Sequence, residues 1–370
     1  MHVGTVKERK DGERRVGLTP ESVSALAAAG HAVTVEAGCG LGSGWDDDAY
    51  RTAGAAVVAE AGGVWEAAGL VVKVKEPLPS EYGFLHRGCA LFTFLHLAAD
   101  RALTERLLEA GATSLAYELV RRPDGSRPLL APMSQVAGRM AAEIGAQLLK
   151  QPGPGRGKLL GGVAGVPPGR AVVVGSGVVG TAAARVLMGL DARVTVLSRD
   201  LARLAALQEY FGGRLATRVA SAGALAEEAA GADLVVLGLL VAGAPAPKVL
   251  TRSMVRSMGP GAVVVDVSID QGGAAETSRP TSHSQPTYLE EGVIHYCVPN
   301  MPGAVPQTST RALTSATLPY VLALADAGVE DALRADTGFA EALSTYGGGL
   351  VRGPVAATFG LAAAGNPFVA

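Results

Sequence analysis

The sequence VVVGSGVVG at residues 172–180 is the feature that most restricts the fold of this chain. An apolar strand runs directly into three glycines with the spacing G-x-G-x-x-G. The first glycine permits a tight turn, the second lets a pyrophosphate approach the backbone, and the third lets the next helix lie close to the sheet. A purely structural turn is the alternative, but strand, loop, helix and second strand follow at the right distances for a dinucleotide site. The residues expected at the cofactor are Gly175, Gly177, Val178, Val179 and Gly180.

The strand after this loop ends in an unusual way. Its sequence at residues 193–199 is RVTVLSR, so Ser198 and Arg199 stand where NAD-binding proteins normally carry an acidic residue for the adenosine ribose. A carboxylate about 4 Å from a phosphate would repel it by roughly 4 kcal/mol at an effective dielectric near 20, and this barrier is missing. Ser198 can donate to a 2′-phosphate, and Arg199 and Arg203 add positive charge. We therefore predict that NADP(H) is accepted and preferred; the alternative is NAD, with Ser198 on its ribose and both arginines in solvent.

The first third of the chain alternates strand and helix patterns. Helical segments at 19–30 and 100–111 separate the strands, and Thr19 and Pro20 are typical of a helix start. This alternation indicates right-handed βαβ units and a mostly parallel sheet. The apolar segments predicted as strands are 31–37, 70–77, 90–97 and 113–120.

A helical pattern at 132–150 leads into a second α/β run, and helical periodicity resumes at 308–328. The fold class predicted is α/β, with two Rossmann-like domains that each contain a parallel sheet. Because further chain follows the last helix, we expect it to return to the first domain, which makes that domain discontinuous around the dinucleotide-binding domain. The expected boundaries are 1–130 for the first part of the substrate domain, 131–303 for the dinucleotide-binding domain with its linking helix, and 304–370 for the return.

Composition excludes several classes of protein. A formal net charge of −2 gives no electrostatic reason to bind a nucleic acid. Cys39, Cys89 and Cys297 are far apart, odd in number and without C-x-x-C spacing, which argues against a disulfide framework or a zinc site. The amino-terminal residues are charged, and no run approaches the roughly 18 apolar residues of a membrane span. We expect a cytoplasmic enzyme without a membrane or nucleic-acid partner.

Four titratable residues stand near expected strand ends or turns: Arg15, Lys75, His96 and Asp270. Ligands of open α/β sheets bind at the carboxyl ends of the strands, so Lys75 and His96 are placed where a substrate would bind. A solvated lysine and a hydrogen-bonded core histidine are the ordinary alternatives. Asp270 precedes two glycines, for which turn formation is the alternative, and Arg15 is otherwise a surface arginine.

These segments together resemble the alanine dehydrogenase and pyridine nucleotide transhydrogenase family. The resemblance covers nearly the whole chain. It implies a discontinuous substrate domain and a central Rossmann domain, a homohexamer, and conversion of L-alanine, water and a nicotinamide cofactor to pyruvate and ammonia. The matching segments are RVGLTP (15–20), KVKEP (73–77), LFTFLHLA (91–98), LLAPMS (129–134), DQGG (270–273), SRPT (278–281) and NMPGAVPQTST (300–310).

The resemblance also implies residue roles. Arg15 and Lys75 bind the substrate carboxylate and keto oxygen, His96 donates and accepts protons, and Asp270 organises water and the tetrahedral amino-alcohol. The chemistry needs these groups, because hydride leaves the α-carbon only when the nitrogen lone pair is available, and a histidine titrates in the right range. The remaining residues that the resemblance implies are Asn300 at the substrate and Ser134 and Met301 at the cofactor.

The sequence departs from the family pattern at Gln135, where a glutamate is expected, and at Ser198, where an aspartate is expected. Neither change removes a predicted catalytic group. Two alternative functions stay open: reductive amination of another small 2-oxo acid, and a nucleotide-binding subunit of a proton-translocating transhydrogenase. The second has no amino-acid substrate, so the lysine and histidine in KVKEP and FLHLA argue against it.

Overall fold

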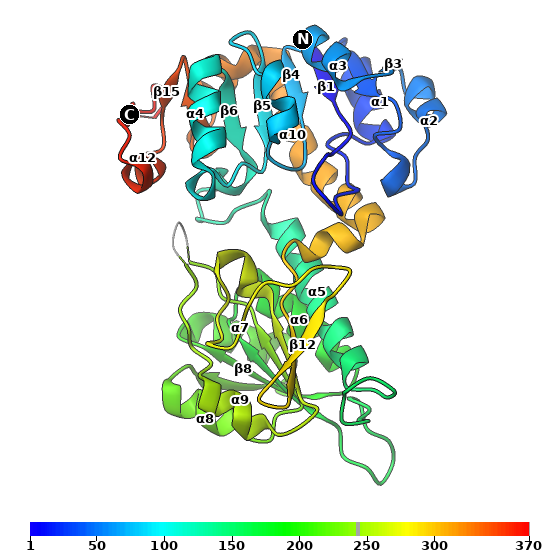
Figure 1. Ribbon diagram of the computed structural model, residues 1–370, viewed down its shortest axis with the longest axis vertical. Helices are drawn as coiled ribbons and strands as arrows, with labels where there is room; N and C mark the ends of the chain where they lie inside the picture. The colour runs from blue at the N-terminus through cyan, green and yellow to red at the C-terminus, as the bar shows by residue number, and fades with distance from the viewer. Residues whose placement is uncertain (242–244, 370) are drawn as a thin grey trace. The chain divides into compact units, whose positions relative to one another are not determined.

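The computed structural model describes residues 1–241 and 245–369, and its chain divides into two compact units (Figure 1). The first unit consists of residues 1–133 and 303–370, and the second of residues 134–302. Each unit contains one mostly parallel sheet with helices packed against it. The predicted fold class is therefore confirmed, including a first domain that the chain leaves and re-enters.

The sheet of the first unit has eight strands in the order β15-β14-β6-β5-β4-β1-β2-β3. The strands from β6 to β3 are parallel, and β14 and β15 add an antiparallel edge. The strand bounds are β1 His2–Thr5, β2 Ala32–Glu36, β3 Ala56–Val58, β4 Leu70–Val72, β5 Ala90–Thr93, β6 Thr113–Ala116, β14 Leu343–Tyr346 and β15 Gly349–Leu350.

Local sequence signals explain the helix ends of this unit. The Thr19 hydroxyl accepts the N–H of Ser22 at the start of α1, and the Asp100 carboxylate accepts the N–H of Leu103 at the start of α4. Gly111 ends α4 in a left-handed conformation with a φ of 63°. The helix bounds are α1 Pro20–Ala28, α2 Asp47–Thr52, α3 Ala61–Ala67, α4 Arg101–Ala110, α10 Pro306–Ala335, α11 Thr337–Ala340 and α12 Gly353–Phe359.

The sheet of the second unit has seven strands in the order β12-β13-β11-β10-β7-β8-β9, all parallel except the edge strand β12. The strand bounds are β7 Arg170–Val174, β8 Arg193–Ser198, β9 Ala216–Val219, β10 Leu234–Leu237, β11 Val263–Asp266, β12 Thr287–Glu290 and β13 Val293–Tyr296. The helices are α5 Ala131–Leu148, α6 Val178–Gly189, α7 Leu201–Tyr210, α8 Ala222–Ala229 and α9 Arg252–Met258.

The parallel strands of both sheets follow the same doubly wound order. In the first unit the chain builds β1, β2 and β3 outward to one side and then continues with β4, β5 and β6 on the other. In the second unit β7, β8 and β9 are followed in the same way by β10, β11 and β13. The direction of strand addition reverses beside β1 and beside β7, and ligands of such sheets bind at the carboxyl ends of the strands at this reversal.

The strands are shorter than the apolar segments predicted. β4 ends at Val72 and β5 at Thr93, so Lys75 and His96 lie in the connections that follow them. Asp270 does not end a strand, because β11 stops at Asp266 and residues Val267–Gln271 form a 3₁₀ turn. The predicted apolar segments therefore contain β2, β4, β5 and β6 but extend past their carboxyl ends, where the chain leaves the hydrogen-bonding ladder. The strands β1, β3, β14 and β15 were not predicted.

One helix bears on the expectation that no apolar run is long enough to span a membrane. The helix α10 is long and apolar enough to cross a membrane by length and composition, and 33% of its most apolar 18-residue window is buried within the structure. One such helix is weak evidence for a membrane span. Its buried residues include Leu313, Val321 and Leu324, and it packs against α1 and α11 of the first unit. We therefore interpret it as a core helix, since none of its large apolar side chains is among the exposed ones in the described part of the chain.

The fold of the second unit depends on the close approach of α6 to β7. A Cβ atom on Gly180 would lie 1.8 Å from the carbonyl oxygen of Gly175, and a Cβ atom on Gly238 would lie 2.9 Å from Val179 Cγ1. No side chain fits at these distances. The helix can therefore lie against the sheet only because these positions are glycine.

We predict that Gly180→Ala lowers the free energy of unfolding by more than about 3 kcal/mol, because the added methyl group forces α6 away from the sheet. The matched control is Gly189→Ala at the other end of α6, where a Cβ atom meets nothing within 4 Å. That variant should be neutral or slightly stabilising, by up to about 1 kcal/mol. Urea denaturation followed by circular dichroism measures both, and equal stability of the two variants would contradict the steric argument.

Candidate functional site

The glycine loop of the second unit has the geometry that a pyrophosphate requires. Gly175 has a φ of 111°, which a residue with a side chain rarely adopts, and a Cβ atom there would lie 2.6 Å from the Gly238 carbonyl oxygen. Gly177 caps the amino terminus of α6, and a Cβ atom on it would meet nothing within 4 Å. The backbone at Gly177 is therefore open, and the first N–H groups of α6, which begins with Val178 and Val179, belong to the same turn. This arrangement fits a dinucleotide.

The end of β8 lies beside this loop. The Ser176 hydroxyl donates a hydrogen bond to Ser198 Oγ at 2.7 Å, and the N–H of Asp200 donates to the same oxygen at 3.1 Å. Ser176 was not among the predicted site residues, although its place between two glycines of the motif was a signal. Arg199 is exposed. The structure thus brings Ser198 together with the glycine loop.

Asp200 changes the interpretation of Arg203. Its carboxylate accepts the Arg203 N–H at 3.0 Å as the N-cap of α7, and its other oxygen lies 3.2 Å from Arg203 Nε. Arg203 is therefore paired with an acidic residue that the sequence interpretation did not weigh. Of the two arginines predicted at the cofactor, Arg199 is the one for which no such ion pair is found among the described residues.

The turn that carries Asp270 is anchored by a buried carboxylate. Asp266 accepts the N–H groups of Ser268 and Ala274 at 3.0 and 2.7 Å and the Ser278 hydroxyl at 2.6 Å. Burial raises the pKa of Asp266, against the opposing effect of these hydrogen bonds. Sequence reasoning missed Asp266, because the residues that bind it are spread over the loop that follows.

Asp270 and Asn300 are brought together in the second unit. Asp270 is exposed, and its Oδ1 accepts the Asn300 N–H at 3.2 Å. Asn300 has a φ of 57°, one of four positive values among non-glycine residues in the described part of the chain. Met301, next in sequence, is buried. Ser134 lies in α5 of the same unit, followed by Gln135.

In the first unit, Lys75 and His96 follow two paired strands, β4 and β5, each by three residues. The Thr93 hydroxyl donates to the Lys75 carbonyl oxygen at 2.9 Å, which ties the two connections together. Lys75 is 9% exposed, so the alternative of a solvated lysine is wrong. His96 is exposed, so the alternative of a core histidine is also wrong.

Arg15 is buried rather than on the surface, with 2% of its area exposed. Glu13 orients it through two parallel contacts, at 2.7 Å to Nε and 2.5 Å to Nη2. The Nη1 atom lies 3.0 Å from the Met133 sulfur. The guanidinium is thus fixed by a carboxylate along one edge.

A buried ion cluster that sequence reasoning missed lies where strand addition reverses in the first sheet. Lys73 is fully buried, with its Nζ atom 2.8 Å from Glu81 and 3.4 Å from Glu8. Burial opposes the charged form of Lys73, but the two carboxylates outweigh it and raise its pKa. Burial raises the pKa of Glu8. Glu8 also accepts the Val74 N–H at 2.6 Å, so the cluster fixes the backbone that leads to Lys75.

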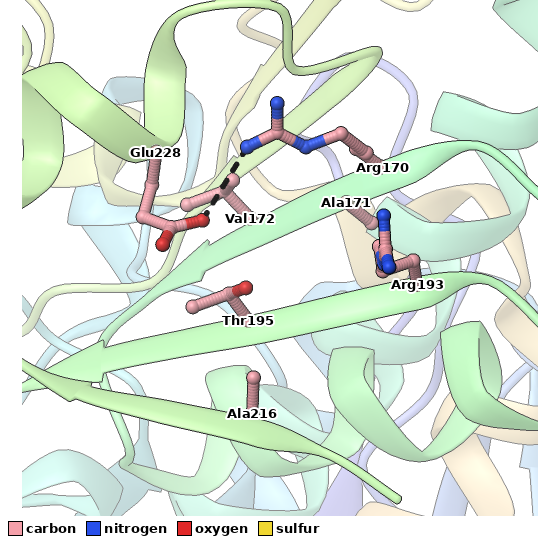
Figure 2. Close-up of a pocket in the computed structure, with 7 residues that line it drawn as sticks. All are labelled: Arg170, Ala171, Val172, Arg193, Thr195, Ala216 and Glu228. Carbon is pink, nitrogen blue, oxygen red and sulfur yellow. Dashed lines mark ion pairs between the residues drawn. The ribbon is translucent and has the colours of Figure 1, made fainter.

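A cavity of about 240 Å³ in the second unit lies away from the glycine loop (Figure 2). Its lining includes Arg170, Arg193 and Ala216, which begin β7, β8 and β9, whereas the glycine loop follows the opposite end of β7. Figure 2 shows Arg170 paired with Glu228 there, at 3.6 Å. The position at the amino ends of the strands excludes it as the pyrophosphate site.

A second cavity, of about 360 Å³, lies in the first unit and is lined by Glu8, Glu13 and Arg15 among others. It places open volume beside the arginine predicted to bind substrate. Among the described residues, no group of three His, Cys, Asp or Glu side chains is arranged to hold a metal ion. The three cysteines are buried, and burial raises the pKa of each thiol.

Comparison with known proteins assigns the chain to a family. Residues 4–137 match the model of the alanine dehydrogenase/PNT N-terminal domain, and residues 141–353 match that of the C-terminal domain. The chain belongs to the alanine dehydrogenase/PNT family. The family resemblance predicted from the sequence motifs is therefore confirmed.

Individual relatives agree with this assignment. The alanine dehydrogenase of Halomonas elongata is 50% identical over 361 residues, which cover 98% of this chain and 97% of that protein. The alanine dehydrogenase of Bacillus subtilis is 48% identical, with coverage of 97% and 95%. A solved L-alanine dehydrogenase superimposes with a TM-score of 0.94 at 48% identity, covering 97% of this chain and 99% of that one. A transhydrogenase from Sinorhizobium meliloti superimposes with a TM-score of 0.83 at 25% identity, covering 95% and 100%.

Proposed function

We propose that this protein is an L-alanine dehydrogenase, which catalyses the reversible oxidative deamination of L-alanine to pyruvate and ammonia. The observation that carries the proposal is 50% identity to an alanine dehydrogenase over nearly the full length of both chains. The sequence identity to a transhydrogenase of known structure is 25%, half the identity to the alanine dehydrogenase. This difference favours the dehydrogenase over the nucleotide-binding subunit of a proton-translocating transhydrogenase.

The nicotinamide cofactor, when bound, supplies the hydride acceptor for oxidation and the hydride donor for the reverse reaction. The groups proposed to hold it are the glycine loop at 175–180, the β8 end at Ser198 and Arg199, and the residues Ser134 and Met301. The open backbone at Gly177 and the uncrowded amino terminus of α6 support this assignment.

The proposed roles of the other site residues follow from their chemistry. Arg15 binds the substrate carboxylate, and Glu13 holds its guanidinium in one orientation for this purpose. Lys75 polarises the keto oxygen, and because Lys75 is only 9% exposed, water screens this interaction little. His96 takes the ammonium proton, so that the nitrogen lone pair can assist loss of hydride from the α-carbon.

Asp270 is proposed to act on the second half of the reaction. The imine formed by oxidation takes up water, and collapse of the resulting amino-alcohol to pyruvate and ammonia needs a proton relay. An exposed carboxylate held by the Asn300 N–H can orient that water. Asn300 is therefore assigned a place at the substrate.

We predict NAD(P)H oxidation in ammonia with pyruvate, followed by absorbance at the nicotinamide band. Glyoxylate and 2-oxobutyrate in the same assay test the remaining alternative, reductive amination of another small 2-oxo acid. Pyruvate should give the highest kcat/KM of the three substrates. If none of the three supports oxidation, the dehydrogenase proposal is wrong. If glyoxylate or 2-oxobutyrate gives the highest kcat/KM, the proposed substrate is wrong, and the product is an amino acid other than alanine.

We predict that His96→Ala and Asp270→Asn each lower kcat by about 10² or more, the usual effect of losing an acid–base group. The matched controls are His283→Ala and Asp191→Asn, two exposed residues of the second unit. Asp191 has a φ of 59°, which asparagine tolerates. Steady-state kinetics across pH measures these effects. If either site variant keeps the kcat and pH profile of the parent enzyme, the acid–base role assigned to that residue is wrong.

We further propose that the enzyme accepts NADP(H) and prefers it over NAD(H). Ser198 replaces the carboxylate that would repel a 2′-phosphate, and Arg199 is exposed beside it. The Asp200 carboxylate is engaged with Arg203 and with the amino terminus of α7, which offsets its charge. We accordingly assign the preference for NADP(H) to Ser198 and Arg199. The role assigned to Arg203 is to neutralise the charge of the Asp200 carboxylate.

We predict a higher kcat/KM for NADPH than for NADH under identical pyruvate and ammonia concentrations. Ser198→Asp should move the ratio toward NADH by about tenfold or more, because it restores roughly 1.4 kcal/mol or more of charge repulsion. Arg199→Ala should weaken NADPH alone, and Arg214→Ala, at an exposed position of the same unit, is the control. A tenfold advantage of NADH that Arg199→Ala leaves unchanged would overturn this proposal.

We propose that the chain assembles as a homohexamer in the cytoplasm. The support for this proposal is membership of the alanine dehydrogenase/PNT family, for which the sequence resemblance implied a homohexamer. Sedimentation velocity at micromolar concentration should show the hexamer, and a monomer would contradict it. Cell fractionation tests the location, and recovery in the membrane pellet would refute it.

A further inference from the structure

His96 adopts a backbone conformation that is unfavourable for a residue with a side chain. Its φ is 49° and its ψ is 36°, in the left-handed region. Among the described residues, only three other non-glycine residues have a positive φ. Such strain persists where surrounding contacts enforce it, and it concentrates at functional sites. Some contact must therefore hold the chain in this turn.

The Glu118 carboxylate makes that contact. Its Oε1 atom accepts the His96 N–H at 2.8 Å, and both oxygens lie 3.3 Å from the Leu95 nitrogen as acceptors of its N–H. Glu118 belongs to the 3₁₀ turn Tyr117–Leu119, which follows β6, the strand paired with β5. Its side chain is 14% exposed, so the two N–H groups have a charged acceptor that is largely shielded from water.

Glu118 also lies beside the imidazole. The distance from its Oε1 to His96 Nδ1 is 3.8 Å. The imidazole stacks on the Phe94 ring at an interplanar angle of 3°, with ring centroids 5.9 Å apart. Phe94 in turn meets the Tyr117 ring edge-on at 5.1 Å. The segment Tyr117–Leu119 therefore supports both the backbone and the ring of His96.

We propose that Glu118 is a positioning residue, which holds the left-handed turn at His96 and so keeps the imidazole in place for proton transfer. Glu118 acts through His96 and is not assigned a contact with substrate. The catalytic consequence rests on the proposed function of His96, whereas the structural one does not. Glutamine at this position keeps the oxygen that accepts the His96 N–H and one of the two Leu95 contacts. It replaces the other oxygen by an NH₂ group, which cannot accept the second Leu95 contact.

Amide hydrogen exchange of overlapping peptides across residues 94–99 tests the structural step without any substrate. Glu118→Ala should speed exchange at residues 95 and 96 by about tenfold or more, because both N–H groups lose their acceptor. Glu118→Gln should give a smaller increase. Glu105→Ala, which removes an exposed ion pair with Arg101 on α4, is the matched control and should leave this exchange unchanged. Unchanged exchange in Glu118→Ala would overturn the proposal.

Steady-state kinetics test the catalytic step in variants whose thermal unfolding lies well above the assay temperature. Glu118→Ala should lower kcat by about tenfold or more while KM for pyruvate changes by less than about twofold, and Glu118→Gln should restore most of the loss. An unchanged kcat, or a rise in KM alone, would overturn the positioning role. If none of the 2-oxo acids supports NAD(P)H oxidation by the parent enzyme, the proposed function fails. The exchange experiment alone then decides whether Glu118 holds the turn.

Discussion

The close approach of α6 to β7 is the constraint on which the second unit depends. A Cβ atom at Gly180 would fall 1.8 Å from a backbone oxygen, so the helix axis can lie this near the sheet only without a side chain. The same requirement passes to α5, because a Cβ atom on Gly138 would lie 2.2 Å from the Val179 carbonyl oxygen. Glycines thus set the spacing of two helices and the sheet. The loop itself is open at Gly177, where a Cβ atom would meet nothing within 4 Å, so a phosphate can approach the backbone there.

The parallel strands of the two sheets share one doubly wound order, but different residues lie at the position where the direction of strand addition reverses. In the second unit that point carries the glycine loop, whose backbone N–H groups suit a phosphate. In the first unit it carries the buried Glu8, Lys73 and Glu81, with Lys75 two residues beyond Lys73. A buried ion cluster adds little net stability, since desolvation offsets the attraction, but removing one partner leaves uncompensated charge. The cluster therefore serves to fix the strand end, as the glycines do in the other unit.

The sequence predicted what local chemistry determines. Apolar runs located β2, β4, β5 and β6, Thr19 marked a helix start, and the glycine spacing located the turn before α6. The short strands β1, β3, β14 and β15 were not predicted. It did not predict contacts between residues far apart in the chain. Glu118 reaches the turn at His96 across 22 positions. One local contact was also missed: Asp200, the N-cap of α7, pairs with Arg203 three residues further on. The predicted strands were too long because buried residues continue past the last hydrogen bond of the sheet. In LVVKVKEP, β4 ends at Val72, and the buried Lys73 that follows belongs to an ion cluster and not to a strand.

The two left-handed site residues are held by the same kind of contact. The His96 N–H donates to Glu118, and the Asn300 N–H donates to Asp270, so each strained turn is closed by a carboxylate from another segment. A hydrogen bond to an ionised acceptor is stronger than one between neutral groups, which makes a carboxylate suited to offset the cost of left-handed backbone. The contact acts in both directions. It fixes the carboxylate as well as the turn, so at Asn300 the bond that closes the turn also restrains the orientation of Asp270, the group assigned to the water.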